Sequence, residues 1–295
     1  MSEVAGPWPS QVFLTLLGLP LDDLHTLLEL KEGIIRPNVV VGKPLKHPEV
    51  TAYQVQTARR VYDYFDAHID ERGSARGDDV LSHLLDADLD GDRLSHDDVL
   101  DVCFLLLIAG LDTVAASLDC FFVHLAEHPE RRRRIVDDPS SIPSAVEELL
   151  RWETPVMLVP RVAVRDTVLG GCPVAAGTVV LALLGAANLD ADADADADAY
   201  GLADAVADGG ADAVADDVLF DREVNRHLAF GGGVHRCLGS HLARVELRIA
   251  LEVWHARLPE YSLAPGAELD FSFGIRAAAA VPLVLGPSRA DRVAE

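Results

Sequence analysis

Residues 230–239 of this 295-residue chain read FGGGVHRCLG, and a run with helical apolar spacing, residues 240–258, follows directly. Three consecutive glycines permit backbone angles that are closed to other residues, so the chain can wrap closely round a ligand. The stretch places one cysteine, Cys237, at the mouth of the predicted helix. Backbone N–H groups, the positive end of that helix and the neighbouring Arg236 favour the thiolate form. A thiolate enclosed by such a loop suits a soft metal centre.

The string FGGGVHRCLG followed by SHLARVEL resembles the haem-binding signature of the cytochrome P-450 family. The resemblance implies that Cys237 is the axial thiolate ligand of the iron of haem b and that Phe230 shields the sulfur. It also places His235 and Arg236 near the haem propionates. The haem contacts implied in this loop are Phe230, Gly231, His235, Arg236, Cys237 and Gly239. The alternative is an ordinary glycine-rich turn before a helix, with a buried cysteine.

The composition excludes several classes of protein. The formal net charge is −23, from 25 Lys and Arg against 48 Asp and Glu, so a phosphate backbone is repelled and nucleic acid is not expected as a partner. Four cysteines at unrelated spacings form no disulfide framework, which is typical of a reducing compartment. The N-terminus has no apolar signal core, and Asp112 interrupts the longest apolar run, residues 102–111. We therefore expect a cytoplasmic protein with no membrane span.

Much of the acidity lies in residues 190–217, which consist almost entirely of Ala, Asp, Gly and Val. Such a low-complexity segment cannot bury enough apolar surface to offset the entropy of ordering it, which predicts a loop. A calcium site is the alternative, but the regular ligand spacing with a bidentate glutamate is missing. We expect a single domain over residues 1–295, with this acidic loop inside it.

Residues 99–128 are apolar on nearly every face up to Asp112, which predicts a long helix through the interior. It contains the sequence AGLDT, in which small residues admit a flat cofactor or dioxygen, and an acid beside a hydroxyl can pass protons. AGLDT resembles the oxygen-binding groove of the family. The resemblance implies that Ala109 and Gly110 line the groove, that Thr113 orients the oxygen and that Asp112 supplies protons. For the motif alone, the alternative is tight helix packing with an i−4 hydroxyl bond.

A second signature lies upstream of the cysteine loop. Glu148 and Arg151 are three residues apart, so they share one face of a predicted helix. The sequence EELLR, followed by Trp and then Thr-Pro, resembles the second motif of the family. The resemblance implies a buried ion pair of Glu148 and Arg151 with a third residue, Arg222, that braces the cysteine loop. This role is structural rather than chemical.

Two arginine-containing segments complete the site residues. Arg161 lies in PVMLVPRVAV, residues 155–164, where the resemblance implies an arginine that binds a propionate bidentately. Residues 156–159 and the turn at 271–275 are then expected to line the substrate pocket. The basic run HPERRRR at 128–134 is expected to be a solvated helix face, with a docking patch as the alternative.

The resemblance covers nearly the whole chain from Gln11 onward and begins well inside the domain of the family. Helical spacing predicts two helices within 11–37, joined at a proline turn, and further helices at 48–72 and 78–86. Glycine turns and β-branched runs after residue 155 predict small sheets. The expected fold is mainly α with small β-sheets: an N-terminally truncated cytochrome P-450 fold. Its long central helix and the helix after the cysteine loop sandwich the haem.

The implied function is a haem-dependent monooxygenase that inserts one oxygen atom from O2 into an apolar small-molecule substrate. The chain has no flavin or iron–sulfur motif, so electrons are expected from separate proteins, a ferredoxin with its reductase or a similar donor. One alternative is a non-catalytic, truncated haem-binding remnant. Another is a zinc module that uses His235, Cys237 and His241.

Overall fold

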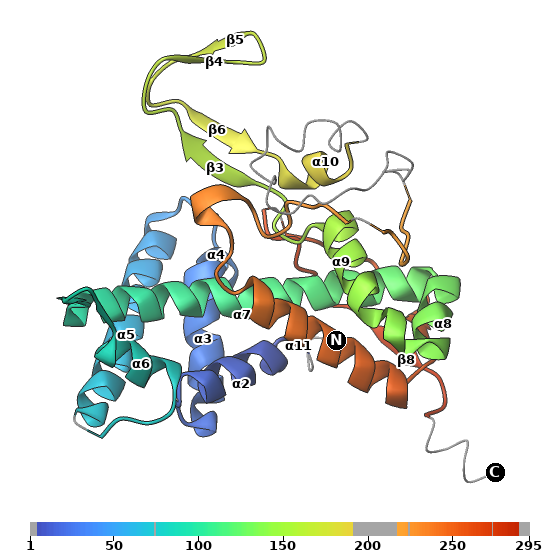
Figure 1. Cartoon of the computed structure of the whole chain (residues 1–295), viewed down its shortest axis with the longest axis horizontal. Coiled ribbons are helices and arrows are strands. Elements are labelled where there is room, and N and C mark those ends of the chain that lie inside the picture. The colour runs from blue at the N-terminus through green and yellow to red at the C-terminus, as the bar shows by residue number, and fades with distance from the viewer. Residues whose placement is uncertain (1–4, 74, 191–216, 224, 273, 289–295) are drawn as a thin grey trace. The chain divides into compact units, whose positions relative to one another are not determined.

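The computed structural model describes residues 5–73, 75–190, 217–223, 225–272 and 274–288. The chain divides into two compact units, Ser2–Ala115 and Ala116–Glu295, and each is described by itself. Both are built from helices with small two-stranded sheets, and those of the second unit follow residue 155, as the sequence predicts (Figure 1). The longest helix, α7, contributes residues to both units.

Local sequence signals account for the starts of several helices of the first unit. Proline occupies the first turn of three of them, where its missing N–H costs nothing. Asp79 caps another, since its Oδ1 accepts a hydrogen bond from the N–H of Ser82 at 2.8 Å. The two helices predicted around the proline turn are present. The elements are α2 (Pro7–Leu16), η1 (Leu21–Asp23), α3 (Leu24–Ile35), α4 (Pro37–Val41), α5 (Pro48–Arg72) and α6 (Val80–Asp86).

A small hairpin that the sequence analysis missed leads into α7 (His96–Glu127). Its strands are β1 (Asp88–Leu89) and β2 (Asp92–Arg93). The two residues between them are Asp90 and Gly91, with φ of 56° and 87°, which is the geometry a tight hairpin turn requires. Beyond it, Ser95 and Asp98 form a capping box at the start of α7 through reciprocal bonds of 3.2 and 2.9 Å.

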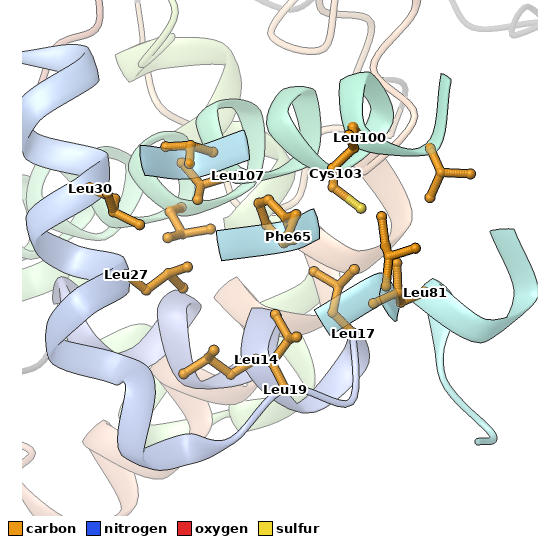
Figure 2. Packing of buried hydrophobic residues seen from close by; sticks show 14 of the residues in the cluster. Leu14, Leu17, Leu19, Leu27, Leu30, Phe65, Leu81, Leu100, Cys103 and Leu107 are labelled. Carbon is orange, nitrogen blue, oxygen red and sulfur yellow. The ribbon is translucent and has the colours of Figure 1, made fainter. Parts of the chain in front are cut away.

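The core of the first unit surrounds Phe65, a fully buried residue of α5 (Figure 2). Leucines from α2, α3, α6 and α7 pack in the same cluster, and Cys103 of α7 lies among them. Helices α3 and α5 approach closely because Gly33 has no side chain: a Cβ there would lie 2.8 Å from Cγ2 of Thr57. The cluster also includes Leu14, Leu17, Leu19, Leu27, Leu30, Leu81, Leu100 and Leu107.

In its described residues, the second unit combines helices with three antiparallel pairs of strands. Helix α11 (Ser240–Arg257) packs against α9 (Ile142–Glu153). Figure 1 shows β4 and β5 continuing outward from β3 and β6 as a narrow ribbon. The helices are α8 (Pro129–Asp137), α9 (Ile142–Glu153), α10 (Leu184–Asn188) and α11 (Ser240–Arg257), with short turns η2 (Pro139–Ser141) and η5 (Gly233–His235). The paired strands are β3 (Val159–Val162) with β6 (Val179–Ala182), β4 (Thr167–Leu169) with β5 (Cys172–Val174), and β7 (Tyr261–Leu263) with β8 (Leu283–Leu285).

The basic run at the start of α8 is only partly the solvated face that the sequence predicts: its last two arginines are exposed, but Arg132 is not. Arg132 is only 4% exposed and donates to the carbonyl oxygens of Leu125 and Tyr261, at 3.1 and 2.6 Å. Its guanidinium also pairs with Glu260 at 2.9 Å and lies 4.6 Å from the centre of the Tyr261 ring. The expectation fails because helical spacing turns one arginine of the run inward, where it satisfies buried carbonyl groups.

By length and composition alone, α7 is long and apolar enough to cross a membrane, which the interruption at Asp112 did not lead us to expect. Half of its most apolar stretch is buried inside the protein, as in the core helix of a soluble protein. One such helix is weak support for a membrane span. No other helix among the described residues passes the same test.

Candidate functional site

The cysteine loop, residues 230–239, is closed by a hydrogen bond from the N–H of Cys237 to the carbonyl oxygen of Phe230, at 2.9 Å. Gly231 and Gly233 have φ of +66° and +64°, a left-handed conformation in which a side chain is strained. A Cβ at Gly233 would meet nothing within 4 Å, so backbone conformation rather than crowding requires glycine there. The glycine run therefore shapes the loop as predicted.

The Cys237 thiol is exposed at the start of α11, and Gly239 is the residue that precedes this helix. A Cβ at Gly239 would lie 4.0 Å from the sulfur. Two apolar residues of the same loop, Val234 and Leu238, are 98% and 88% exposed. An accessible sulfur flanked by uncovered apolar groups fits a flat, apolar cofactor that binds through the thiolate. The residues present thus fit haem.

An ion pair supports the start of the loop. The Cζ atom of Arg244 on α11 lies 4.5 Å from the centre of the Phe230 ring. The same guanidinium binds both carboxylate oxygens of Glu147 on α9, at 2.6 and 2.8 Å, and Nε2 of His227 lies 3.1 Å from Glu147. Burial alone would raise the pKa of Glu147, but hydrogen bonds from His227 and Arg244 lower it to about 2.

The sequence analysis did not identify Glu147, Arg244 or His227 as partners. The sequence signal for these contacts was the pair of consecutive glutamates, Glu147 and Glu148. Neighbouring residues on a helix point in directions about 100° apart, so each glutamate faces different partners. Glu147 and Glu148 accordingly serve different partners.

Glu148 is completely buried and is the centre of the predicted ion-pair network. Arg151 donates to its two oxygens at 3.0 and 2.8 Å, and Arg222 donates to them at 3.0 Å each. The N–H of Leu219 and Nδ2 of Asn225 add bonds of 2.9 and 2.8 Å. Burial alone would raise the pKa of Glu148, but these donors lower it to about 2. The predicted association of Glu148 with Arg151 and Arg222 is confirmed.

Arg151 also joins the two sides of the acidic stretch. Its Nη1 donates to the carbonyl oxygen of Asn188 and its Nη2 to that of Asp217, each at 2.9 Å. Asn188 is itself buried and accepts a bond from the N–H of Leu228 at 2.6 Å. Residues 191–216, on which most of the acidic-loop prediction falls, lie outside the described residues.

The chain leaves α9 through a strained residue. Thr154 has φ 38° and ψ 72°, a left-handed conformation that is rare for a β-branched side chain. Its hydroxyl donates to the carbonyl oxygen of Arg151 at 2.7 Å and accepts from Nδ2 of Asn188 at 2.8 Å. These bonds hold the turn from α9 into residues 155–159.

The other predicted cofactor contacts of the second unit are exposed. Arg161 lies on β3 and donates to the carbonyl oxygen of Pro160 at 2.8 Å. His235 ends η5, and Arg236 follows it. The structure therefore gathers six of the predicted contacts in one loop and places Arg161 on a strand. The six are Phe230, Gly231, His235, Arg236, Cys237 and Gly239.

In the first unit, the predicted oxygen-groove residues Ala109, Gly110, Asp112 and Thr113 share one stretch of α7. The hydroxyl of Thr113 donates to the carbonyl oxygen of Ala109 at 2.9 Å, a bond that is local to the helix.

Asp112 is only 2% exposed, and two cations hold its carboxylate. Arg36 binds it bidentately, at 2.9 and 2.8 Å, and Nζ of Lys31 lies 3.5 Å away. Burial alone would lower the pKa of Arg36, but the bonds to Asp112 and Glu32 raise it above its ordinary value. Sequence reasoning missed Arg36 and Lys31, because nothing in a local pattern relates residues 76 positions apart.

Glu246 on α11 is a buried carboxylate, 5% exposed, and its Oε2 has no hydrogen-bond partner among the described residues. Burial raises its pKa from 4.5 to about 7. A raised folded-state pKa means that this group stabilises the fold below about pH 4.5 and loses that contribution as the pH rises through 7.

We predict that Glu246→Gln melts at a higher temperature than the wild type at pH 8, and that the melting temperatures of the two proteins nearly coincide at pH 4. Thermal melts followed by circular dichroism test this, and equal gains at both pH values would contradict it.

The zinc alternative gains no support from the structure. Across the described residues, no group of three or more His, Cys, Asp or Glu side chains is placed to hold a metal ion. His235, Cys237 and His241 therefore do not form such a cluster.

A family model for cytochrome P-450 matches residues 42–139 and 142–254. The chain belongs to the cytochrome P-450 family. It is 38% identical over 272 residues to the mycinamicin IV hydroxylase/epoxidase of Micromonospora griseorubida, covering 90% of this chain and 61% of that protein. It is 31% identical to the vitamin D(3) 25-hydroxylase of Pseudonocardia autotrophica, covering 98% of this chain and 66% of that one. The chain thus spans about three fifths of the length of the first of these cytochrome P-450 relatives.

Solved cytochrome P-450 structures confirm the fold. The open cytochrome P-450 Eryk from S. erythraea superposes with a TM-score of 0.83 and 28% identity, over 97% of this chain and 68% of that one. CYP109E1 from Bacillus megaterium, in complex with testosterone, gives a TM-score of 0.76 and 26% identity, over 96% of this chain and 70% of that one. The mainly helical cytochrome P-450 fold, shortened relative to these structures, is therefore correct as predicted.

Proposed function

We propose that this chain is a haem-dependent monooxygenase that inserts one oxygen atom from O2 into an apolar organic substrate. The observation that carries the proposal is the closed glycine loop, which presents the Cys237 thiol at the start of α11. When bound, haem b supplies the oxygen chemistry, and thiolate ligation favours cleavage of the O–O bond. Membership of the cytochrome P-450 family supports both the cofactor and the reaction class.

The residues of the cysteine loop divide into a ligand and its supports. Cys237 is the proposed axial ligand and Phe230 the shield of its sulfur, with Arg244 packed on the Phe230 ring. Gly231 and Gly239 leave room for the cofactor. Three exposed cationic or titratable side chains are proposed to bind the propionates: Arg161, His235 and Arg236.

On α7, Ala109 and Gly110 are proposed to line the oxygen groove. Thr113 orients oxygen through its hydroxyl, which donates to Ala109 at 2.9 Å in this structure. Asp112 is proposed to supply protons, and the bidentate contact with Arg36 fixes the orientation of its carboxylate.

The proposed substrate is apolar, because residues 156–159, which follow the Thr154 turn, carry only hydrocarbon or thioether side chains. A relative named as a hydroxylase/epoxidase supports this reaction class. Electrons are proposed to come from a ferredoxin and its reductase or a similar donor. A cytoplasmic location is proposed for this chain, and its similarity to bacterial cytochrome P-450 relatives supports this.

Replacing Cys237 with serine tests the ligand directly. The chain is expressed with a haem precursor, purified, reduced and exposed to carbon monoxide. The wild type is expected to show the red-shifted Soret band of a thiolate-ligated complex, and Cys237→Ser is expected to lose it while the circular dichroism spectrum is retained. Cys172→Ser is the matched control, since Cys172 is also an exposed cysteine. An imidazole-like band, or no bound haem in the wild type, would overturn the proposal.

The alternative of a non-catalytic, haem-binding remnant predicts the same band without turnover. The relatives do not favour it, since they are named as hydroxylases. Substrate-dependent formation of a hydroxylated or epoxidised product, driven by a ferredoxin and its reductase, separates the two.

A further inference from the structure

A network of hydrogen-bonded charged side chains in the second unit has no part in the proposed haem chemistry. Its centre is Glu153, the last residue of α9, which is only 7% exposed. Nδ1 of His124 on α7 lies 2.9 Å from its Oε1, and Nη1 of Arg276 binds its Oε2. Arg131 of α8 extends this network with contacts to Nε2 of His124 at 3.0 Å and to Asp217 at 2.7 Å.

The arrangement admits one set of donors and acceptors. A guanidinium only donates, so Nε2 of His124 accepts from Arg131. Nδ1 of His124 then carries the proton and donates to Glu153. Glu153 therefore receives one bond on each oxygen, from His124 and from Arg276. A buried carboxylate satisfied on both oxygens is fixed in orientation, because any rotation leaves a charge unsatisfied.

The backbone around Glu153 and Arg276 is joined as well. The N–H of Arg276 donates to the carbonyl oxygen of Pro155 at 2.7 Å, and the N–H of Met157 donates to that of Gly274 at 3.0 Å. The thiol of Cys120 on α7 donates to the carbonyl oxygen of Arg276 at 3.1 Å. Residues 155–157 and 274–276 are therefore held together by backbone bonds, and the Glu153–Arg276 ion pair lies beside them.

We propose that Glu153 is a positioning residue that fixes the spacing of residues 155–157 and 274–276. By holding Arg276 to the end of α9, it determines which apolar substrates bind productively between these segments. The part concerning substrates rests on the proposed function and on the expectation from the sequence that residues 156–159 and the turn at 271–275 line the substrate pocket. The brace, by which we mean the contacts of Glu153 with His124 and Arg276, does not depend on the proposed function.

Cys120 provides a reporter for the brace that does not depend on haem. Burial raises the pKa of the thiols of Cys120 and Cys103 to about 12, so both react slowly with alkylating reagents in the folded protein. Cys120 contacts Arg276, whereas Cys103 belongs to the core of the first unit. In Glu153→Gln, which keeps the shape of the side chain, we expect iodoacetamide to modify Cys120 about tenfold faster or more, with the rate at Cys103 unchanged. Mass spectrometry distinguishes the four cysteines.

Three further variants guard this test against simple misfolding. Arg276→Gln removes the guanidinium that binds Glu153 and is expected to raise the alkylation rate of Cys120 similarly. In the double variant with Glu153→Gln, this rate is expected to be lower than in either single variant, since two amides can pair. Glu260→Gln, which removes the partner of Arg132, is the matched control and should leave the rate at Cys120 unchanged. Unchanged Cys120 protection in Glu153→Gln, or equal acceleration at Cys103, overturns the proposal.

The effect on substrate selection is measured on the haem-loaded chain. Saturated fatty acids of increasing chain length are titrated, and their dissociation constants are read from the shift of the Soret band. We expect Glu153→Gln to change the order of preference among chain lengths and Glu260→Gln to leave it unchanged; an unaltered order in Glu153→Gln overturns the role in selection. If the wild type lacks the Soret band of a thiolate-ligated complex, the proposed function is wrong. The alkylation rates of Cys120 still test the positioning role of Glu153 in that case.

Discussion

Replacing Glu148 with alanine is expected to lower the free energy of unfolding by about 3–5 kcal/mol, because it removes the carboxylate that two buried guanidinium groups share. Arg151 and Arg222 are held within 3.0 Å of this carboxylate, and their own exposure is small. The same oxygens orient the N–H of Leu219 and the amide of Asn225, ahead of the cysteine loop. Haem retention in the loaded protein is expected to fall along with stability.

Urea unfolding followed by circular dichroism measures this loss. Glu130→Ala is the matched control, because Glu130 is an exposed acid whose substitution should cost less than about 1 kcal/mol. The pKa of Glu148 lies at about 2 in the folded protein, below its ordinary 4.5, so the network contributes above about pH 4.5 and is lost as the pH falls through 2. The difference between wild type and Glu148→Ala should therefore shrink towards pH 2. A constant difference would mean that the stabilisation is not electrostatic.

Replacing Asp112 with alanine is expected to destabilise the first unit by a similar amount, about 3–5 kcal/mol. The carboxylate is almost fully buried and binds Arg36 bidentately, with Lys31 nearby, so its removal leaves two cations in a poorly solvated place. The double variant with Arg36→Ala is expected to lose less than the sum of the two single variants, by about 0.5–3 kcal/mol.

Chemical unfolding of the four proteins of this cycle gives the coupling energy between Asp112 and Arg36. Glu29→Ala is the control, because Glu29 pairs with Arg60 at 2.9 Å but both are exposed, and we expect a loss below about 1 kcal/mol. Additive losses in the cycle would show that Asp112 and Arg36 do not stabilise one another.

In the haem-loaded protein, Asp112→Asn keeps the shape of the side chain and is expected to slow turnover by about 100-fold or more if Asp112 supplies protons.

Features written into consecutive residues were predictable. The α5 helix runs from Pro48 to Arg72 as its apolar spacing predicts. Glu148, Arg151 and Arg222 were predictable together because a family motif relates them. The hairpin turn at Asp90-Gly91 had a recognisable dipeptide and was overlooked.

Features that depend on packing were not predictable. Arg132 reads as one member of a charged run, yet carbonyl groups from Leu125 and Tyr261 decide its orientation. Arg36 meets Asp112 only because α3, its following turn and α7 pack in one core. Glu153 looks like an ordinary surface glutamate at a helix end, and its partners come from residues 29 and 123 positions away. No local pattern contains such contacts.

The two carbonyl groups held by Arg151, those of Asn188 and Asp217, belong to residues on either side of the Ala-Asp repeat. One guanidinium fastens both residues to α9, so these two bonds fix their positions relative to this helix. Loss of the Arg151 side chain would therefore release two separate points of the chain from α9 at once, in addition to removing a partner of Glu148.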